Sequence, residues 1–138
     1  MRKFYDEKKG WLDLATFMYI TMVFNTTEDL ADLDKLNDYI SQEHYTEHNP
    51  GIGDDLSQLK GVLSDYNSGS FASVEYKKCH RLLAEGNFVL SVCEGYAKQT
   101  HSSFFDLYRV TDGKIVEHWD TTEAIPPRSE WKNNNGKF

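Results

Sequence analysis

The sequence contains few of the residues that cross-link a chain, since it has only two cysteines and three prolines in 138 residues. Two cysteines, Cys79 and Cys93, cannot make a disulfide framework, and no C-x-x-C pair is present. We therefore expect both thiols to be reduced, as small residues within strands. The charged segment 1–10 does not resemble a signal peptide, so we expect a soluble, cytoplasmic protein.

Positive charge is also scarce, because 15 Lys and Arg residues face 22 Asp and Glu residues for a net charge of −7. No basic run exceeds a pair, and a nucleic-acid partner would require a basic patch. The most apolar stretch, residues 11–24, is interrupted by Asp13 and is too short to span a bilayer. These shortages predict no nucleic-acid partner and no membrane partner.

The order of the expected elements indicates an α+β fold. The chain has the length of one domain, with a core over about residues 5–127 and an irregular tail over 128–138. A long apolar helix is expected over 5–24, and apolar residues at helical spacing predict two more helices separated by a loop over 42–53. The residues that define these two helices are Leu30, Leu33, Leu36 and Ile40, and then Leu56, Leu59 and Leu63.

The second half of the chain predicts strands over 73–84, 87–98, 102–111 and 114–122. Asp112-Gly113 predicts a two-residue hairpin turn, and we place the other turns at 85–87 and in the segment around Thr100-His101. Strands of this length must twist and bend, which gives the sheet a concave side. Helices followed by strands then pack on one face of that sheet.

The last hairpin determines which side chains share a face. Alternation along a strand puts His118 and Asp120 on one face, and Glu117 and Trp119 on the other. We expect Phe105, Leu107 and Val116 to share the face of His118. The opposite, outer face is then expected to carry Asp106 and Tyr108, with Tyr108 directly opposite Glu117. An outer face rich in Trp and Tyr predicts a homodimer formed through the sheet.

Four strings of sequence, in this order, resemble the SnoaL-like polyketide cyclase family of the NTF2-like superfamily. They are His48-Asn49-Pro50, His80 to Asn87, Phe105 to Val110, and Asp112 to Asp120. The resemblance covers about residues 10–127. It implies an NTF2-like cone in which N-terminal helices pack on a strongly curved antiparallel β-sheet and enclose a pocket.

The resemblance also implies one catalytic residue, and the residues around it suggest its partners. Asp120 matches the Asp that acts as general acid and base in the cyclases, which close a ring by aldol condensation without metal or cofactor. His118 and His48 would orient the carboxylate or polarise the carbonyl oxygen, and Pro50 would hold His48 at the pocket rim. The candidate substrate-binding residues are His80, Phe105, Leu107, Val116, Phe17 and Tyr45. We place His80 on the face that carries Leu82, Val89 and Ser91.

The function expected from this reading is cofactor-free acid/base catalysis on a small hydrophobic carbonyl compound, by aldol condensation, isomerisation or dehydration. A non-catalytic protein that binds a hydrophobic ligand or acts as a scaffold remains an alternative, and a metal-dependent hydrolase is a second one. No metal is expected, because the His44 and His48 pair lies in a loop that ends at a proline. The surroundings of Asp120 distinguish the first two functions: an apolar pocket and a nearby histidine favour an enzyme, whereas an arginine partner favours binding.

Overall fold

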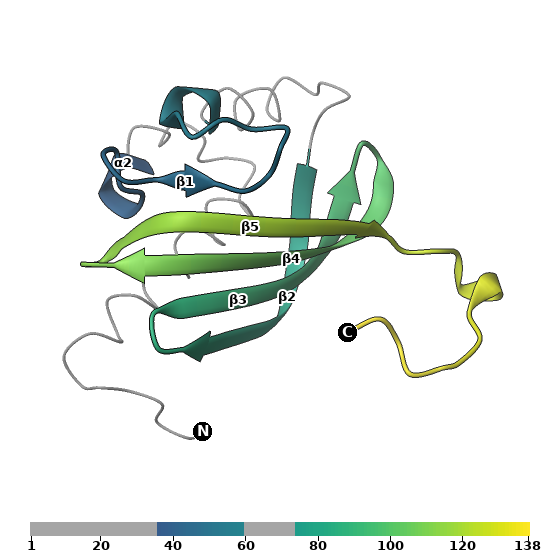
Figure 1. Ribbon diagram of the computed structural model, residues 1–138. Helices are drawn as coiled ribbons and strands as arrows, with labels where there is room; N and C mark the ends of the chain where they lie inside the picture. Colours follow the sequence, from purple (N-terminus) through teal and green to yellow (C-terminus); the bar gives the residue numbers. More distant parts are fainter. Residues whose placement is uncertain (1–35, 60–73) are drawn as a thin grey trace.

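One sheet organises the part of the chain that the computed structural model describes, residues 36–59 and 74–138. Five strands lie in the order β1-β5-β4-β3-β2, with β1 parallel to β5 and the other pairs antiparallel. Figure 1 shows the strong twist of the sheet and the helical segment near α2 above it. The elements are α2 (Leu36–Tyr39), β1 (Thr46–Glu47), β2 (Val74–Glu85), β3 (Phe88–Ala97), β4 (Thr100–Thr111), β5 (Lys114–Ala124) and η2 (Arg128–Glu130).

The helix expected over 5–24 and the candidate residue Phe17 lie outside the described residues. So do most of the two other expected helices, of which the structure describes α2 and the helical residues 56–59. Within the described part, no helix is long and apolar enough to cross a membrane. A single domain over residues 1–138 stays a prediction.

The four long strands lie where the sequence predicts them, with ends that agree within two residues. The Asp112-Gly113 turn is confirmed, because both residues have the positive φ that this turn requires, 51° and 77°. The middle turn was predicted wrongly. It is made by Lys98 and Gln99, at φ 48° and 65°, and residues 100–101 belong to β4.

The loop expected over 42–53 contains a strand that the sequence did not predict. Strand β1 pairs in parallel with β5, so that Thr46 lies opposite Glu117 and Glu47 opposite His118. A two-residue strand is too short to show a periodic pattern. Its position nevertheless brings the segment around Glu47 to the middle of β5.

A bulge between β4 and β5 changes which residues share a face. A hairpin without a bulge would place Tyr108 opposite Glu117, as we predicted. The register shifts between Arg109 and Val110, so Tyr108 lies opposite His118 and Asp106 opposite Asp120. One extra residue moves every side chain beyond it to the other face.

The predicted face of four residues is therefore wrong. Asp106 and Tyr108 share the face of His118 and are buried, whereas Phe105 and Leu107 lie on the other face and are half-buried. We call the face of His118 and Asp106 the inner face, and the face of Phe105 and Leu107 the outer face.

A similar irregularity in β2 corrects two predictions. The register against β3 shifts between Cys79 and Arg81, which places Cys79 directly opposite Cys93. The two cysteines form a disulfide, so the expectation of reduced thiols is wrong. His80 lies at this shift, and its Nε2 atom is 3.3 Å from the carboxylate of Glu94. It is therefore not on the face of Ser91.

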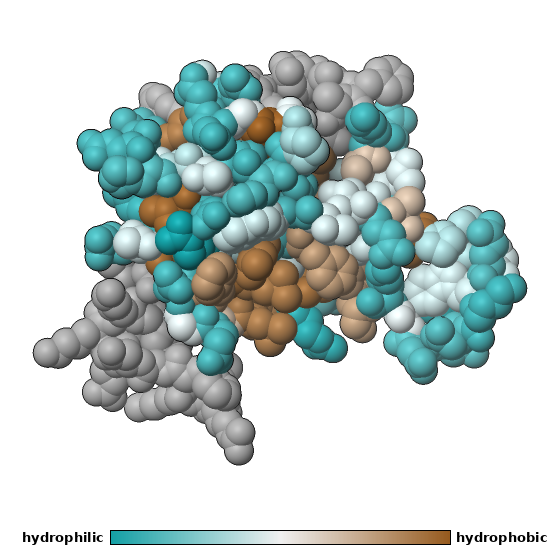
Figure 2. Space-filling model, in the orientation of Figure 1, coloured by the Kyte–Doolittle hydropathy of each residue, from teal (hydrophilic) through white to brown (hydrophobic). Residues whose placement is uncertain are grey.

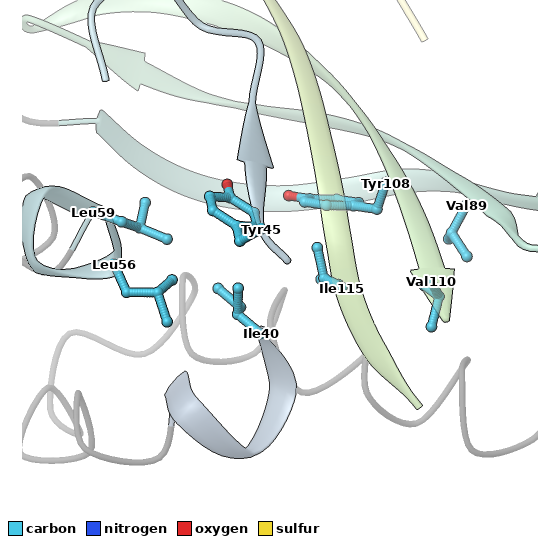
Figure 3. Close-up of a cluster of buried hydrophobic side chains, with 8 residues drawn as sticks. All are labelled: Ile40, Tyr45, Leu56, Leu59, Val89, Tyr108, Val110 and Ile115. Carbon is cyan, nitrogen blue, oxygen red and sulfur yellow. The ribbon is translucent and has the colours of Figure 1, made fainter. Parts of the chain in front are cut away.

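The hydrophobic core lies on the inner face, at the end of the sheet near the β4–β5 turn. Figure 3 shows residues from the helical segments converging on residues of β3, β4 and β5. The aliphatic side chains fill one side of the cluster, and the rings of Tyr45 and Tyr108 bring two phenol oxygens to its border. The members are Ile40, Tyr45, Leu56, Leu59, Val89, Tyr108, Val110 and Ile115.

The tail from residue 125 is irregular, as predicted, except for the short helix η2. Strand β5 continues to Ala124, two residues beyond its expected end. The tail returns to the sheet, where the ring of Phe138 stacks on His80 with centroids 4.1 Å apart.

Candidate functional site

A network of polar side chains crosses the inner face, with one residue from each of the five strands. Glu47, Ser91 and Asp106 have exposed fractions of only 9%, 1% and 2%. Burial of polar and charged groups is costly unless they are paired, so this network needs a full set of partners. Its members are Glu47 of β1, Tyr76 of β2, Ser91 of β3, Asp106 of β4 and His118 of β5.

His118 occupies the centre of the network, between two carboxylates. Its Nδ1 atom lies 3.0 Å from Glu47 Oε2, and its Nε2 atom lies 3.5 Å from Asp106 Oδ1. The second contact is an ion pair without hydrogen-bond alignment. Burial alone would lower the pKa of His118, but Asp106 and Glu47 outweigh it and raise that pKa to about 9. The imidazole is therefore charged at neutral pH, stacked on Tyr108.

Glu47 joins β1 to the rest of the site through several hydrogen bonds. Tyr45 donates its hydroxyl to Glu47 Oε2 at 2.5 Å, and the backbone N–H of Asn49 donates to Oε1 at 2.9 Å. Burial would raise the pKa of Glu47, but the hydrogen bond from His118 and these donors lower it overall. Glu47 is thus the ionised partner of a charged histidine.

Asp106 is held from the opposite side of the network. The hydroxyl of Tyr76 donates to it at 3.1 Å, and the hydroxyl of Ser91 donates at 3.2 Å. Burial, followed by the neighbouring charge of Asp106, raises the pKa of Tyr76 well above its ordinary value. Tyr76 therefore remains a protonated donor at any pH at which the protein would work.

Asp120 lies directly across the β4–β5 ladder from Asp106, on the same face. It is half-buried, and its carboxylate Oδ2 accepts a hydrogen bond of 2.9 Å from the side-chain amide of Asn49. Burial raises the pKa of Asp120, and the like charges of Asp106 and Glu47 add to this effect. The charge of His118 and the Asn49 hydrogen bond oppose it only in part. A carboxylate in these surroundings is a stronger base than one in water.

The structure brings together three of the predicted site residues, Asp120, His118 and Tyr45. Phe105 and Leu107 lie on the outer face, and His80 pairs with Glu94 there. Val116 is buried beside the β4–β5 bulge. The charged groups that act on Asp120 are instead His118, Asp106 and Glu47.

His48 also lies away from Asp120, contrary to our prediction. Its ring stacks on Trp119 with centroids 4.5 Å apart, and its Nε2 atom lies 2.8 Å from Glu117. Arg109 binds the other oxygen of Glu117 at 2.5 Å. Successive residues of an extended segment point to opposite sides, so Glu47 and Asn49 point to the inner face and His48 to the outer face.

Five residues of the site were not among the predicted ones: Glu47, Asn49, Tyr76, Ser91 and Asp106. A charged residue inside the apolar run Phe105-Asp106-Leu107 is a signal that could have identified Asp106, because buried charge usually has a partner. Asn49 entered the prediction only as part of the His48-Asn49-Pro50 string. Glu47 has no such signal, since β1 cannot be recognised in the sequence.

Among residues 36–59 and 74–138, no group of three or more His, Cys, Asp or Glu side chains could hold a metal ion. The charged groups of the network are instead arranged to neutralise one another, with one cation between carboxylates.

Comparison with known proteins gives a fold but no close relative. No protein-family model matches the sequence, and no curated protein matches it. A proposed polyketide cyclase from Bacillus cereus has a similar structure, with a TM-score of 0.65 at 15% identity over 86% of this chain and 79% of that one. A steroid delta-isomerase from Pseudomonas aeruginosa gives a TM-score of 0.60 at 17% identity over 87% and 83%.

A SnoaL-like polyketide cyclase from Agrobacterium tumefaciens is similar too, with a TM-score of 0.57 at 10% identity over 80% of this chain and 91% of that one. The chain has the NTF2-like fold. The curved sheet with helices on one side is the expected cone, and the fold prediction is confirmed. At these identities an NTF2-like fold does not by itself establish an activity, so the function has to be argued from the site.

Proposed function

We propose that this NTF2-like protein is a cofactor-free acid/base enzyme in which Asp120 moves a proton on a small, hydrophobic carbonyl compound. The observation that carries the proposal is the position of Asp120. This carboxylate is half-buried on the inner face, across from the buried Asp106, and its hydrogen-bond partner among the described residues is an amide rather than an arginine. Its raised pKa is the property that a general base needs.

The reaction requires no other reagent. Asp120 takes a proton from the carbon next to the carbonyl group, and the electron pair of the broken C–H bond moves into an enolate. The enolate carbon can attack a second carbonyl carbon, and the alkoxide formed then takes the proton back from Asp120. Return of the proton to a different carbon would give isomerisation instead, and in both cases the carboxylate is regenerated.

His118 has a different role from the one we predicted. Both of its nitrogens face carboxylates, so it neither abstracts a proton nor reaches a carbonyl oxygen. It supplies a fixed positive charge that keeps Glu47 and Asp106 from raising the pKa of Asp120 further. His118 is thus a positioning residue.

The proposal is tested by hydrogen exchange into carbonyl compounds. We would incubate a panel of cyclic and linear β-diketones with the protein in D2O and follow loss of the α-proton signal by NMR. The wild type should catalyse exchange, and Asp120→Asn should lose about 100-fold or more. Asp112→Asn, at an exposed turn, removes the same charge and should match the wild type. Equal exchange rates in wild type and Asp120→Asn would refute the mechanism.

A non-catalytic binding protein is the second candidate, and the completeness of the network favours it. Glu47, Asp106 and His118 all have partners, which is what a purely structural network requires. Native mass spectrometry of freshly purified protein would detect a co-purified ligand. A tightly bound apolar ligand that is unchanged after incubation, together with no exchange activity, would favour binding.

We also propose that the outer face pairs with a second copy of the chain. Figure 2 views this face and shows apolar surface gathered over β3 and β4. Leu83 and Phe88 are 55% and 38% exposed. Two charged residues of this face, Arg109 and Glu117, already bind each other, so burying them does not leave either charge unpaired. An apolar face of this kind is typical of an interface.

A further inference from the structure

The turn after β1 holds one residue, Asn49, whose side chain and backbone are both fixed. Its side-chain Oδ1 accepts a hydrogen bond from the backbone N–H of Gly51 at 2.9 Å, and its carbonyl oxygen accepts one from Ile52 at 3.0 Å. Pro50 restricts the backbone of the residue before it to extended conformations. Asn49 is therefore held by its sequence neighbours before any contact with the sheet is considered.

This arrangement settles which end of the side-chain amide faces Asp120. Because Oδ1 accepts the N–H of Gly51, the NH2 group must point the other way, where it donates to Asp120 Oδ2 at 2.9 Å. The amide cannot be flipped without losing both hydrogen bonds. Only one oxygen of Asp120 has a hydrogen-bond partner among the described residues, so Oδ1 is left for a ligand.

The same turn is connected to the buried network. The backbone N–H of Asn49 donates to Glu47 Oε1, and Glu47 binds the imidazolium of His118. The backbone N–H of the intervening residue, His48, donates to the carbonyl oxygen of His118 at 2.9 Å. Asn49 is thus held in place relative to β5, the strand that carries Asp120.

We propose that Asn49 is a positioning residue that orients the carboxylate of Asp120 and leaves its Oδ1 atom directed at the ligand. The proposal rests on the function proposed above for Asp120. Several groups act electrostatically on Asp120. They are His118 from the same strand, Asp106 from β4, Glu47 from β1, and the phenols of Tyr45 and Tyr76. Asn49 differs from all of them in touching the carboxylate as an uncharged donor.

Asn49→Asp tests the orientation of the Asp120 carboxylate without removing the turn that holds residue 49. An aspartate can still accept the N–H of Gly51, so the turn is kept, but it replaces the donor to Asp120 by a like charge. The carboxyl titration of Asp120, followed by NMR in protein labelled with 13C at carboxyl carbons and assigned with Asp120→Asn, should move upward by about one pH unit. Asn87→Asp, an exposed turn residue, adds the same charge and should leave the titration unchanged.

The side-chain NH2 resonances of Asn49 in the unaltered protein give a second measurement. They should shift with the same midpoint as Asp120, and this dependence should vanish in Asp120→Asn. This keeps the proposal testable if Asn49→Asp does not fold. The proposal would be overturned if the titration of Asp120 were unchanged in a folded Asn49→Asp variant. It would also be overturned if the Asn49 amide resonances did not follow the titration of Asp120.

The two proposals can fail separately. In the exchange assay, Asn49→Asp should move the acid limb of the pH–rate profile to higher pH by the same one unit, so that the rate falls about tenfold at pH values below both midpoints. A shifted titration with exchange unaffected by Asp120→Asn would remove the enzymatic function and leave the positioning of Asp120 intact. An unshifted titration with exchange abolished by Asp120→Asn would do the reverse.

Discussion

At the scale of single residues, the site is a balance of three carboxylates against one cation. Glu47 and Asp106 hold His118 between them, and Asp120 lies beside this group with only an amide as its direct partner. Opposite pKa shifts follow from these contacts, since the pKa of Glu47 is lowered and the pKa of Asp120 is raised. The ionised network therefore stabilises the fold, whereas the negative charge of Asp120 destabilises it.

Asp120→Asn should increase stability at neutral pH. A folded-state pKa that lies above the unfolded value of 3.8 means that ionisation of Asp120 disfavours folding as the pH rises through this range. The variant should thus gain stability relative to the wild type between acidic and neutral pH and hold that gain above it. Urea unfolding at several pH values measures the difference. A variant less stable than the wild type at neutral pH would contradict this.

His118 predicts a further loss of stability with rising pH, in the alkaline range. Its pKa of about 9 lies above the ordinary 6.5, so its contribution is complete below pH 6.5 and is lost as the pH rises through 9. At about 1.4 kcal/mol per pKa unit, this amounts to about 3 kcal/mol. His118→Gln should show little of this alkaline loss in urea unfolding. An equal loss in both proteins would assign it to other groups.

Glu47→Gln should be strongly destabilising. Tyr45 and the Asn49 N–H donate to different oxygens of Glu47, so the single amide oxygen of glutamine replaces only one of these acceptors. The change also removes the charge that faces His118. Breaking a buried ion pair from one side costs about 3–5 kcal/mol. The fair comparison is Glu43→Gln, which removes the same charge from an exposed residue. Thermal unfolding of both would test the difference, and equal melting temperatures would show that Glu47 does not stabilise the network.

At the scale of elements, two irregularities in the ladders decide the site. The β4–β5 bulge turns Asp106 and Tyr108 inward, and the shift near His80 brings Cys79 opposite Cys93. Disulfides are typical of oxidising compartments, so this bond does not support the expected cytoplasmic location. The location stays a prediction.

Loss of this disulfide should lower stability. It closes a loop with a sequence separation of 14 residues, and chain-entropy arguments give about 3 kcal/mol for a loop of this length. Cys79→Ser combined with Cys93→Ser should therefore unfold at lower urea concentration than the wild type. Adding a reductant should destabilise the wild type and leave the double variant unchanged. A wild type insensitive to reductant would contradict the prediction, and mass spectrometry with thiol alkylation would show whether the bond forms.

At the scale of the whole molecule, the outer face is the surface that we propose pairs with a second copy of the chain. If it pairs with a second copy, light scattering after gel filtration should give twice the 16.0 kDa mass of the chain. Leu107→Arg, near the middle of this face, should produce a monomer, because a charge buried at an interface without a partner is costly. Thr111→Arg, exposed next to the β4–β5 turn, should remain dimeric. A monomeric wild type would exclude the dimer.

The sequence alone determined the four long strands, the Asp112-Gly113 turn and the position of Asp120 in the last strand, because turn chemistry and apolar alternation are local signals. Local signals do not include the register beyond a bulge. The pairing of Asp106 with Asp120, the disulfide and the outward position of His48 each depend on one inserted residue or on the short strand β1. Only the tertiary structure decided these, because a side-chain period of two reverses the faces whenever the pairing slips by one residue.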